Sequence, residues 1–328
     1  MPDHIIAVDG GNSKTDVVIV ATTGRLLARV TGPGVVSPLT DLTSWREGLA
    51  EVVSRARHEA RLAPTSKARY GVYMLANCDF ANERRVAQRA LDSLGYTEHT
   101  AVHNDTLAVL RAGATRPWGV AIVAGAGING VGVHPSGRVA GFLALGPYTG
   151  DSGGGRDIGV AGLGAAIRAR DGRGPATALT TLVPRHYGMR TPEDVAIAVH
   201  GGTILEDELR VLAPVVFAAS ASGDAVAIDI IEAFGAEVAT MAVALIRRLS
   251  LMRTDVEVVL GGGTLQTGDQ MLVDQITTAI IGQVPGASVS VLTVAPVVGA
   301  VVEAFRLLEI GKPAMTRARN AIPARSTP

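Results

Sequence analysis

Two glycine-rich turns have the composition needed to bind a chain of phosphates. Each joins two short apolar runs, and a turn of this kind exposes consecutive backbone N–H groups that bind anions. We predict that the ATP phosphates are bound by Gly10, Gly11, Asn12, Ser13, Lys14 and Thr15 in the first turn and by Gly125, Ala126 and Gly127 in the second. Either turn alone is also compatible with an ordinary hairpin. Two equivalent turns on two lobes could hold one phosphate chain from both sides.

A third glycine cluster, Gly261-Gly262-Gly263, follows the apolar run Val256–Leu260 and precedes a helix expected to begin near Asp269. Because glycine has no side chain, the backbone here can approach a flat nucleoside closely. We predict that these three glycines bind the adenosine of ATP. The alternative is a tight strand-to-helix turn without a ligand.

Asp105 is placed to act as a general base. The triplet Asn104-Asp105-Thr106 ends a predicted strand and begins a short helix, and ligands of α/β proteins bind at the carboxyl ends of such strands. A carboxylate there can accept the proton of a hydroxyl that attacks the γ-phosphate. The alternative is that Asp105 only caps the following helix.

Two further aspartates complete the candidate site. Asp9 ends the first strand, and we predict that it holds Mg²⁺ through water together with Asp105. Asp151 lies in the glycine-rich loop 146–155, where it could accept hydrogen bonds from acceptor hydroxyls. Ser152 to Gly155 open a helix whose N–H groups favour negative charge. Capping of that helix by Asp151 is the alternative.

The elements that must position these residues occur twice. From Ile5 the chain runs as strand, glycine turn, strand, tight turn and third strand, and the same order returns from Trp118, with a third strand predicted over 139–145. Both tight turns contain a Gly-Arg pair, in which glycine supplies the positive φ. The repeat predicts an α/β protein of two similar lobes with a cleft between them.

Hydrophobic periodicity predicts the remaining elements and the domain boundaries. Helices are expected near 41–61, 83–94, 156–170 and 225–249, and strands at 70–75, up to Asn104 and at 288–293. We place the N-terminal lobe at 1–115 and the C-terminal, ATP-binding lobe at 116–295, with a hinge near 114–117. A last helix, 296–311, should pack back on the N-terminal lobe. Residues 312–328 lack a hydrophobic stripe and are expected to form a mobile tail.

Composition argues for small-molecule chemistry. The 328 residues carry 30 basic and 30 acidic side chains and no net charge, so no overall field attracts nucleic acid or an anionic membrane. No apolar run is long enough to cross a bilayer and the first residues are not a basic leader, which predicts a cytoplasmic protein. The single cysteine, Cys78, excludes an internal disulfide and a cysteine metal cage within one chain.

At these motifs the chain resembles the family that joins N-acetylglucosamine kinases with the ATPases that activate benzoyl-CoA reductase and 2-hydroxyacyl-CoA dehydratases. The shared segments are DGGNSKTD, HNDT, AGAGIN, PSGR, GDSGGGRDIG and LGGGTL. The resemblance implies a ribonuclease-H-like fold in each lobe, the actin and sugar-kinase architecture, ATP and Mg²⁺ as cofactors, and a homodimer. It implies that Asp105 is the base and that Asp9 lies beside the magnesium. The acceptor would be bound by Asn104, Asp105, Gly127 and Asp151.

The sequence also differs from the family pattern at positions that bear on substrate specificity. The residues usual in N-acetylglucosamine kinases are replaced in this chain at 35–37, at 125–128 and at Ser152. The reductase-activating ATPases share an iron–sulfur cluster through several cysteines, which Cys78 alone cannot supply. The leading hypothesis is therefore a kinase for N-acetylglucosamine or a related sugar. The alternatives are an ATPase coupled to a protein partner and, less well supported, a sugar-sensing repressor.

Overall fold

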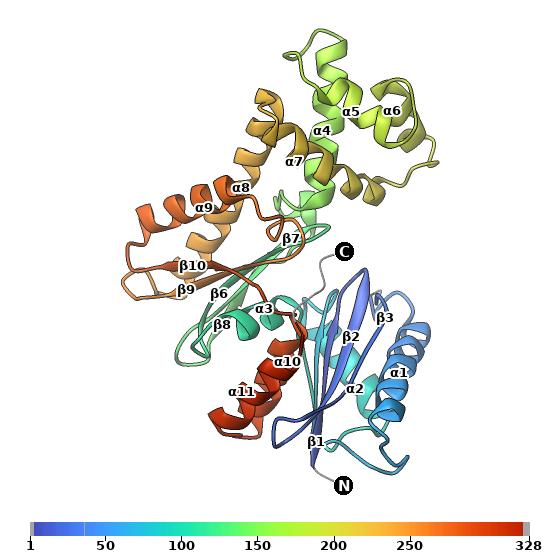
Figure 1. Cartoon of the computed structure of the whole chain (residues 1–328), viewed down its shortest axis with the longest axis vertical. Coiled ribbons are helices and arrows are strands. Elements are labelled where there is room, and N and C mark those ends of the chain that lie inside the picture. The colour runs from blue at the N-terminus through green and yellow to red at the C-terminus, as the bar shows by residue number, and fades with distance from the viewer. Residues whose placement is uncertain (1–2, 36, 324–328) are drawn as a thin grey trace. The chain divides into compact units, whose positions relative to one another are not determined.

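The computed structural model describes residues 3–35 and 37–323 and is drawn in Figure 1. The chain divides into two compact units, one formed by the chain up to Pro117 together with the chain from Leu292, the other by Trp118–Val291. The chain passes from one unit to the other after Pro117 and again after Val291, two and four residues from the predicted boundaries. The sequence departure at Val36 and the last five residues of the predicted tail lie outside the described residues.

The first unit is built on a five-stranded mixed sheet. Its strands are β1 (His4–Gly10), β2 (Lys14–Ala21), β3 (Leu26–Pro33), β4 (Tyr70–Leu75) and β5 (Thr100–Asn104). The order across the sheet is β3-β2-β1-β4-β5. The first three strands form an antiparallel meander, and β4 and β5 run parallel to β1. The carboxyl ends of β1, β4 and β5 therefore meet at one edge of the sheet.

Helices cover both faces of this sheet. Helices α1 (Leu42–Glu59) and α2 (Ala81–Asp92) share an apolar core with alternate residues of β1 and β2. Ile5, Ala7, Val18 and Val20, which alternate with them, are also fully buried, because successive side chains of a strand point to opposite faces. Helix α10 (Val297–Leu307) packs on β1 and β4 and on helix α3 (Thr106–Gly113). The last predicted helix thus returns to the N-terminal unit.

The chain continues into one more helix, α11 (Lys312–Ala321). Arg317 donates through Nε to the carbonyl of Thr23 at 2.9 Å, and Arg319 donates through Nη2 to the carbonyl of Ala112 at 2.6 Å. The prediction of a mobile tail is wrong for these ten residues. They dock through hydrogen bonds from arginines, and such contacts leave no apolar stripe in the sequence.

The second unit repeats the sheet of the first. Its strands are β6 (Gly119–Ala124), β7 (Ile128–Val133), β8 (Val139–Gly141), β9 (Glu257–Gly261) and β10 (Ser288–Val291). The order β8-β7-β6-β9-β10 is that of the first unit, which agrees with the predicted duplication. The third strand is shorter than predicted and ends at Gly141. Ala144 and Gly146 have φ values of 54° and 65°, outside the strand range, and the chain turns into the short helix η1 (Gly146–Tyr148).

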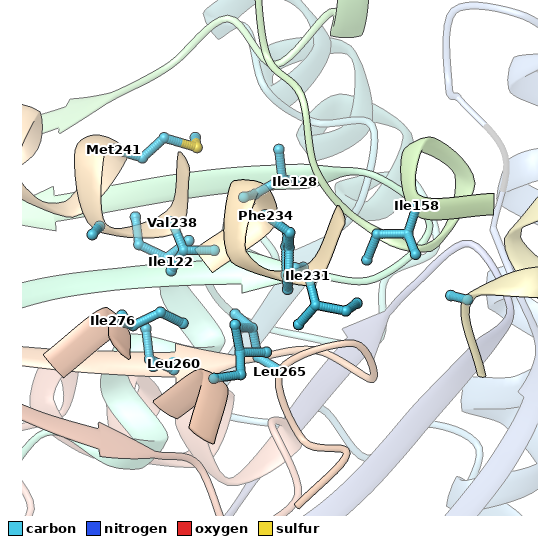
Figure 2. Close-up of a cluster of buried hydrophobic side chains, with 14 of the residues drawn as sticks. Ile122, Ile128, Ile158, Ile231, Phe234, Val238, Met241, Leu260, Leu265 and Ile276 are labelled. Carbon is cyan, nitrogen blue, oxygen red and sulfur yellow. The ribbon is translucent and has the colours of Figure 1, made fainter. Parts of the chain in front are cut away.

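Two long helices cover the second sheet. Helices α8 (Ala225–Arg248) and α9 (Gln270–Gln283) pack against each other and enclose an apolar core. Figure 2 shows Phe234 and Val238 of α8 and Ile276 of α9 beside Ile122 and Leu260 of the strands. This core fixes the turns at the carboxyl ends of β6 and β9.

A helical excursion separates β8 from α8. It consists of α4 (Gly155–Arg170), α5 (Leu179–His186), α6 (Pro192–His200), η2 (Glu206–Leu212) and α7 (Ala213–Ala221). Periodicity alone predicted only α4 of this set. Among the described residues no single helix is long and apolar enough to cross a membrane, although η2–α7 and α8, bent by 116°, pass that test as a pair.

Candidate functional site

The turn between β1 and β2 has the hairpin form expected of a phosphate-binding turn. The N–H of Gly11 donates to the carbonyl of Lys14 at 2.9 Å, and Asn12 and Ser13 are exposed. The chain after β3 passes directly against the turn, since a Cβ on Gly34 would lie 2.1 Å from the carbonyl oxygen of Asn12. Glycine is required there for the close approach.

Thr15 does not share this exposure. Its side chain is fully buried, and its hydroxyl donates to the carbonyl of Pro33 at 2.7 Å. The structure therefore assigns Thr15 to the packing of β2 against β3. Of the six residues predicted in the first turn, it is the one that we no longer include among the phosphate ligands.

The carboxyl edge of the first sheet brings the predicted base to this turn. In the strand register Gly10 pairs with Leu75, and Leu75 pairs with Asn104. Asp105 makes no capping hydrogen bond through its side chain. The side chain of Asn104 caps α3 instead, because its Oδ1 accepts from the N–H of Thr106 at 3.0 Å and from the Thr106 hydroxyl. By hydrogen-bond geometry, the cap of α3 is thus the side chain of Asn104 and not that of Asp105.

The surroundings of Asp105 favour its protonated form. Burial, followed by the negative charges of Asp9 and Asp79, raises the pKa of this carboxyl from 3.8 to about 7, against the opposing effect of the N–H groups of Thr106 and Asp105 itself. A carboxylate with such a pKa is well matched to accepting a proton near neutral pH.

Sequence reasoning missed two residues of this edge, Asn77 and Asp79. Both lie in the turn between β4 and α2. The Nδ2 of Asn77 donates to Oδ1 of Asn12 at 2.7 Å, and the Nδ2 of Asn104 donates to Oδ1 of Asp79 at 2.9 Å. The available signal was the polar Asn-Cys-Asp triplet directly after an apolar strand. Cys78 itself is fully buried, and burial raises the pKa of its thiol to about 12.

The second glycine turn, between β6 and β7, is joined to helix α4. The first N–H groups of that helix, from Gly155 and Arg156, donate to the carbonyls of Gly125 and Ala126 at 2.7 and 2.9 Å. These N–H groups are thus already paired, contrary to the expectation that they serve an anion. The described peptide bonds are trans, so the N–H groups of Ala126 and Gly127 point away from the helix.

Asp151 closes its own loop and does not cap helix α4. Its Oδ2 accepts from the N–H of Gly146 at 3.2 Å and from the hydroxyl of Thr149, while the N-cap of α4 is Gly154. The carboxylate also affects α8, because burial and the charge of Asp151 raise the pKa of Glu237. The loop is therefore held by the carboxylate that was predicted to bind the acceptor.

The third glycine cluster is attached to the second turn. Thr264 donates through its N–H to the carbonyl of Ala124 and through its hydroxyl to the carbonyl of Gly125, both at 3.1 Å. Gly262 has a φ of 89°, and a Cβ there would lie 2.2 Å from the carbonyl oxygen of Ala124. A Cβ on Gly263 would meet no atom within 4 Å. The open side of this cluster is thus at Gly263, while Gly262 shapes the turn.

The aspartates of the first unit provide carboxylate oxygens of the kind that Mg²⁺ prefers. Among the described residues no three His, Cys, Asp or Glu side chains form a metal cage. Magnesium normally keeps several waters and uses one or two carboxylates together with substrate phosphates, and therefore needs no such cage. The raised pKa of Asp105 beside Asp9 marks a concentration of negative charge that a cation would relieve. The donor set fits the ion.

Comparison with known proteins agrees with this architecture. The chain is 26% identical over 266 residues to the N-acetylmuramic acid/N-acetylglucosamine kinase of Clostridium acetobutylicum, covering 80% of this chain and 85% of that one. It is 27% identical over 305 residues to the N-acetyl-D-glucosamine kinase of Dictyostelium discoideum, covering 90% and 95%.

The fold is also that of a candidate N-acetylglucosamine kinase from Chromobacterium violaceum. The TM-score is 0.70 at 21% identity, over 92% of this chain and 98% of that one. This likeness confirms the predicted two-lobed sugar-kinase fold. The model of the BadF/BadG/BcrA/BcrD ATPase family matches residues 6–304, nearly the whole length. The chain therefore belongs to the BadF/BadG/BcrA/BcrD ATPase family.

Proposed function

We propose that this protein is an ATP-dependent kinase that transfers the γ-phosphate of ATP to a hydroxyl of an amino sugar, N-acetylglucosamine or a close relative. The observation that carries the proposal is the carboxylate of Asp105, which directly follows β5 and makes no capping hydrogen bond because Asn104 caps α3. Both curated relatives are kinases of N-acetylated amino sugars, which supports this class of acceptor.

In the proposed reaction the acceptor hydroxyl attacks the γ-phosphorus of ATP. A new oxygen–phosphorus bond forms, the bond to the bridging oxygen of ADP breaks, and the hydroxyl proton passes to the carboxylate of Asp105. With a pKa of about 7, about half of the Asp105 carboxyl is ionised and able to accept that proton at pH 7, and the ionised fraction rises at higher pH. Most of the catalysis would come from positioning and charge stabilisation, as is usual in phosphoryl transfer.

The phosphates would be bound by the turn residues 10–14 and by the N–H groups of Ala126 and Gly127. The direction of these two N–H groups, away from α4, supports this role. Mg²⁺ would be held by Asp9 through water, with Asp105 near its shell, and would neutralise charge on the phosphates. The adenosine would lie on the open side of the third cluster, at Gly263.

The acceptor would be bound by Asp105, by Asp151 and by the backbone at Gly127. Asn104 is a weaker candidate than the sequence suggested, because its amide already bonds Asp79 through Nδ2 and Thr106 through Oδ1. We assign Asn104 to the support of Asp105 and leave the recognition of the sugar to the other three residues.

An ADP-release assay over amino sugars, hexoses and cyclitols tests the proposal. We expect ADP release to depend on an amino sugar, N-acetylglucosamine or a relative, and to be slow with ATP alone. ADP release that does not depend on any sugar but increases with a protein partner would support the ATPase alternative, which no observation favours. The homodimer and the cytoplasmic location stay predictions, and light scattering of the purified chain tests the first.

A further inference from the structure

The turn after β4 lies between the phosphate turn and the base. Strand β4 is the neighbour of both β1 and β5 in the sheet. The pairing continues beyond the strand ends, because the N–H of Ala76 donates to the carbonyl of Gly10 at 2.8 Å and the N–H of Asp105 donates to the carbonyl of Leu75 at 3.3 Å. The residues that follow Ala76 are therefore fixed beside both predicted functional segments.

Two side chains of this turn bond the two segments. Asn77 donates through Nδ2 to Oδ1 of Asn12 in the exposed part of the phosphate turn, at 2.7 Å. Asp79 accepts through Oδ1 from Nδ2 of Asn104 at 2.9 Å. The other end of the same Asn104 amide caps the helix that begins after Asp105. The orientation of Asn104, and with it the start of the helix, thus depends on Asp79.

The turn is itself held rigidly. Arg84 of α2 donates through Nη1 to the carbonyls of Cys78 and Asp79, and Glu83 accepts from the N–H of Phe80 at 2.8 Å. Asn77 has a φ of 60°, a left-handed conformation that is costly for most residues and persists where the surroundings determine it. A turn pinned from the helix behind it can serve as a fixed reference for both neighbours.

We propose that Asn77 and Asp79 are positioning residues, Asp79 for the base-bearing segment at Asn104–Thr106 and Asn77 for the phosphate turn at Asn12. The inference rests on the proposed kinase function and deepens it. It implies that one short turn sets the placement of the proton acceptor relative to the phosphates. Neither residue needs to touch a ligand for this role.

The contribution of Asp79 is tested by comparing Asp79→Ala with Asp79→Asn in steady-state kinetics. Misplacement of a catalytic group by about 1 Å can cost about 10²-fold, so Asp79→Ala should lower kcat by about tenfold or more and change the KM for ATP by less than about twofold. Asp79→Asn keeps an oxygen that accepts from Asn104 and should retain most of the kcat. Asp92→Ala, an exposed change at the end of α2, is the matched control.

The contribution of Asn77 is tested with Asn77→Gly. Glycine adopts the left-handed conformation freely, so this variant removes only the amide bonded to Asn12. We expect a higher KM for ATP with an unchanged KM for the sugar and an unchanged melting temperature.

Different outcomes would overturn the kinase function and the positioning roles of Asn77 and Asp79. Wild-type protein that phosphorylates no amino sugar overturns the proposed function and the inference with it. Active wild-type protein with equal kcat values for Asp79→Ala and Asp79→Asn, or with no rise in the ATP KM of Asn77→Gly, overturns the inference alone.

Discussion

Asp105 is available for chemistry because its neighbour Asn104 caps the helix. Asp105→Asn preserves the size of the side chain but removes the proton acceptor. General-base assistance is worth about 10²–10⁴ in rate, so phosphoryl transfer should fall by at least about two orders of magnitude. ATP affinity, measured by calorimetry, should change little. A loss of turnover of only about threefold would be smaller than expected for a general base and would make Asp151 the candidate base instead.

The same carboxyl should also shape stability. Its pKa is about 7 in the folded protein and close to 3.9 in an unfolded chain, so the folded state binds the proton more tightly. The unfolding free energy of the wild type should therefore fall relative to Asp105→Asn as the pH rises from 4 to 8. The difference should be on the order of 1 kcal/mol or more. Parallel stability curves for the two proteins across this pH range would contradict the raised pKa.

Substitution of two neighbouring glycines in the third cluster should affect two different properties, ATP binding at Gly263 and stability at Gly262. A side chain on Gly263 enters open space, where we place adenosine, whereas a side chain on Gly262 meets the backbone of Ala124. Gly263→Val should weaken ATP binding by about tenfold or more, about 1.4 kcal/mol, without loss of fold. The main effect of Gly262→Val should be a lower melting temperature, because the added side chain disturbs the turn itself. Unchanged ATP affinity in folded Gly263→Val would move the nucleoside elsewhere.

At the scale of elements, a buried ion pair fixes α3 to α10. Arg111 of α3 donates through Nε to Glu303 of α10 at 2.6 Å and through Nη1 to the carbonyl of Pro117. Burial alone would raise the pKa of Glu303, but hydrogen bonds from Arg306 and the charges of both arginines lower it to about 2. The pair therefore stays ionised at neutral pH, beside the first crossing to the second unit.

Loss of one partner should leave a buried charge. Arg111→Met should destabilise the protein by about 3–5 kcal/mol, while Arg111→Met combined with Glu303→Leu should recover most of this loss because no buried unpaired charge remains and Arg306 is half exposed. Denaturant unfolding measures both variants. A double variant as unstable as the single one would show that the packing of α3 on α10, rather than the charge, is limiting.

At the scale of the whole molecule, the chain passes twice between the two units, and the ATP ligands predicted from the sequence come from both of them. We expect an amino sugar together with a non-hydrolysable ATP analogue to bring the units closer, because a closed site excludes water that would otherwise hydrolyse ATP. Small-angle scattering should record a smaller radius of gyration with both ligands than with either alone. An unchanged radius with both ligands bound would argue against closure.

The sequence determined the architecture, because the patterns that indicate strands, turns and helices each lie within a short stretch of the chain. Apolar runs separated by glycine turns predicted both meanders, and amphipathic spacing predicted α1, α8 and α10 within a few residues. The duplicated order of elements predicted two sheets of one topology. The family followed from motifs whose glycines and aspartates stand in a fixed order along the chain.

The tertiary structure decided which polar groups remain available, because hydrogen bonds between distant residues are not encoded in local spacing. It gave the cap of α3 to Asn104, turned Thr15 into the sheet, and paired the first N–H groups of α4 with the second turn. It also brought Asn77 and Asp79 to the candidate site, since only the strand order places β4 between β1 and β5.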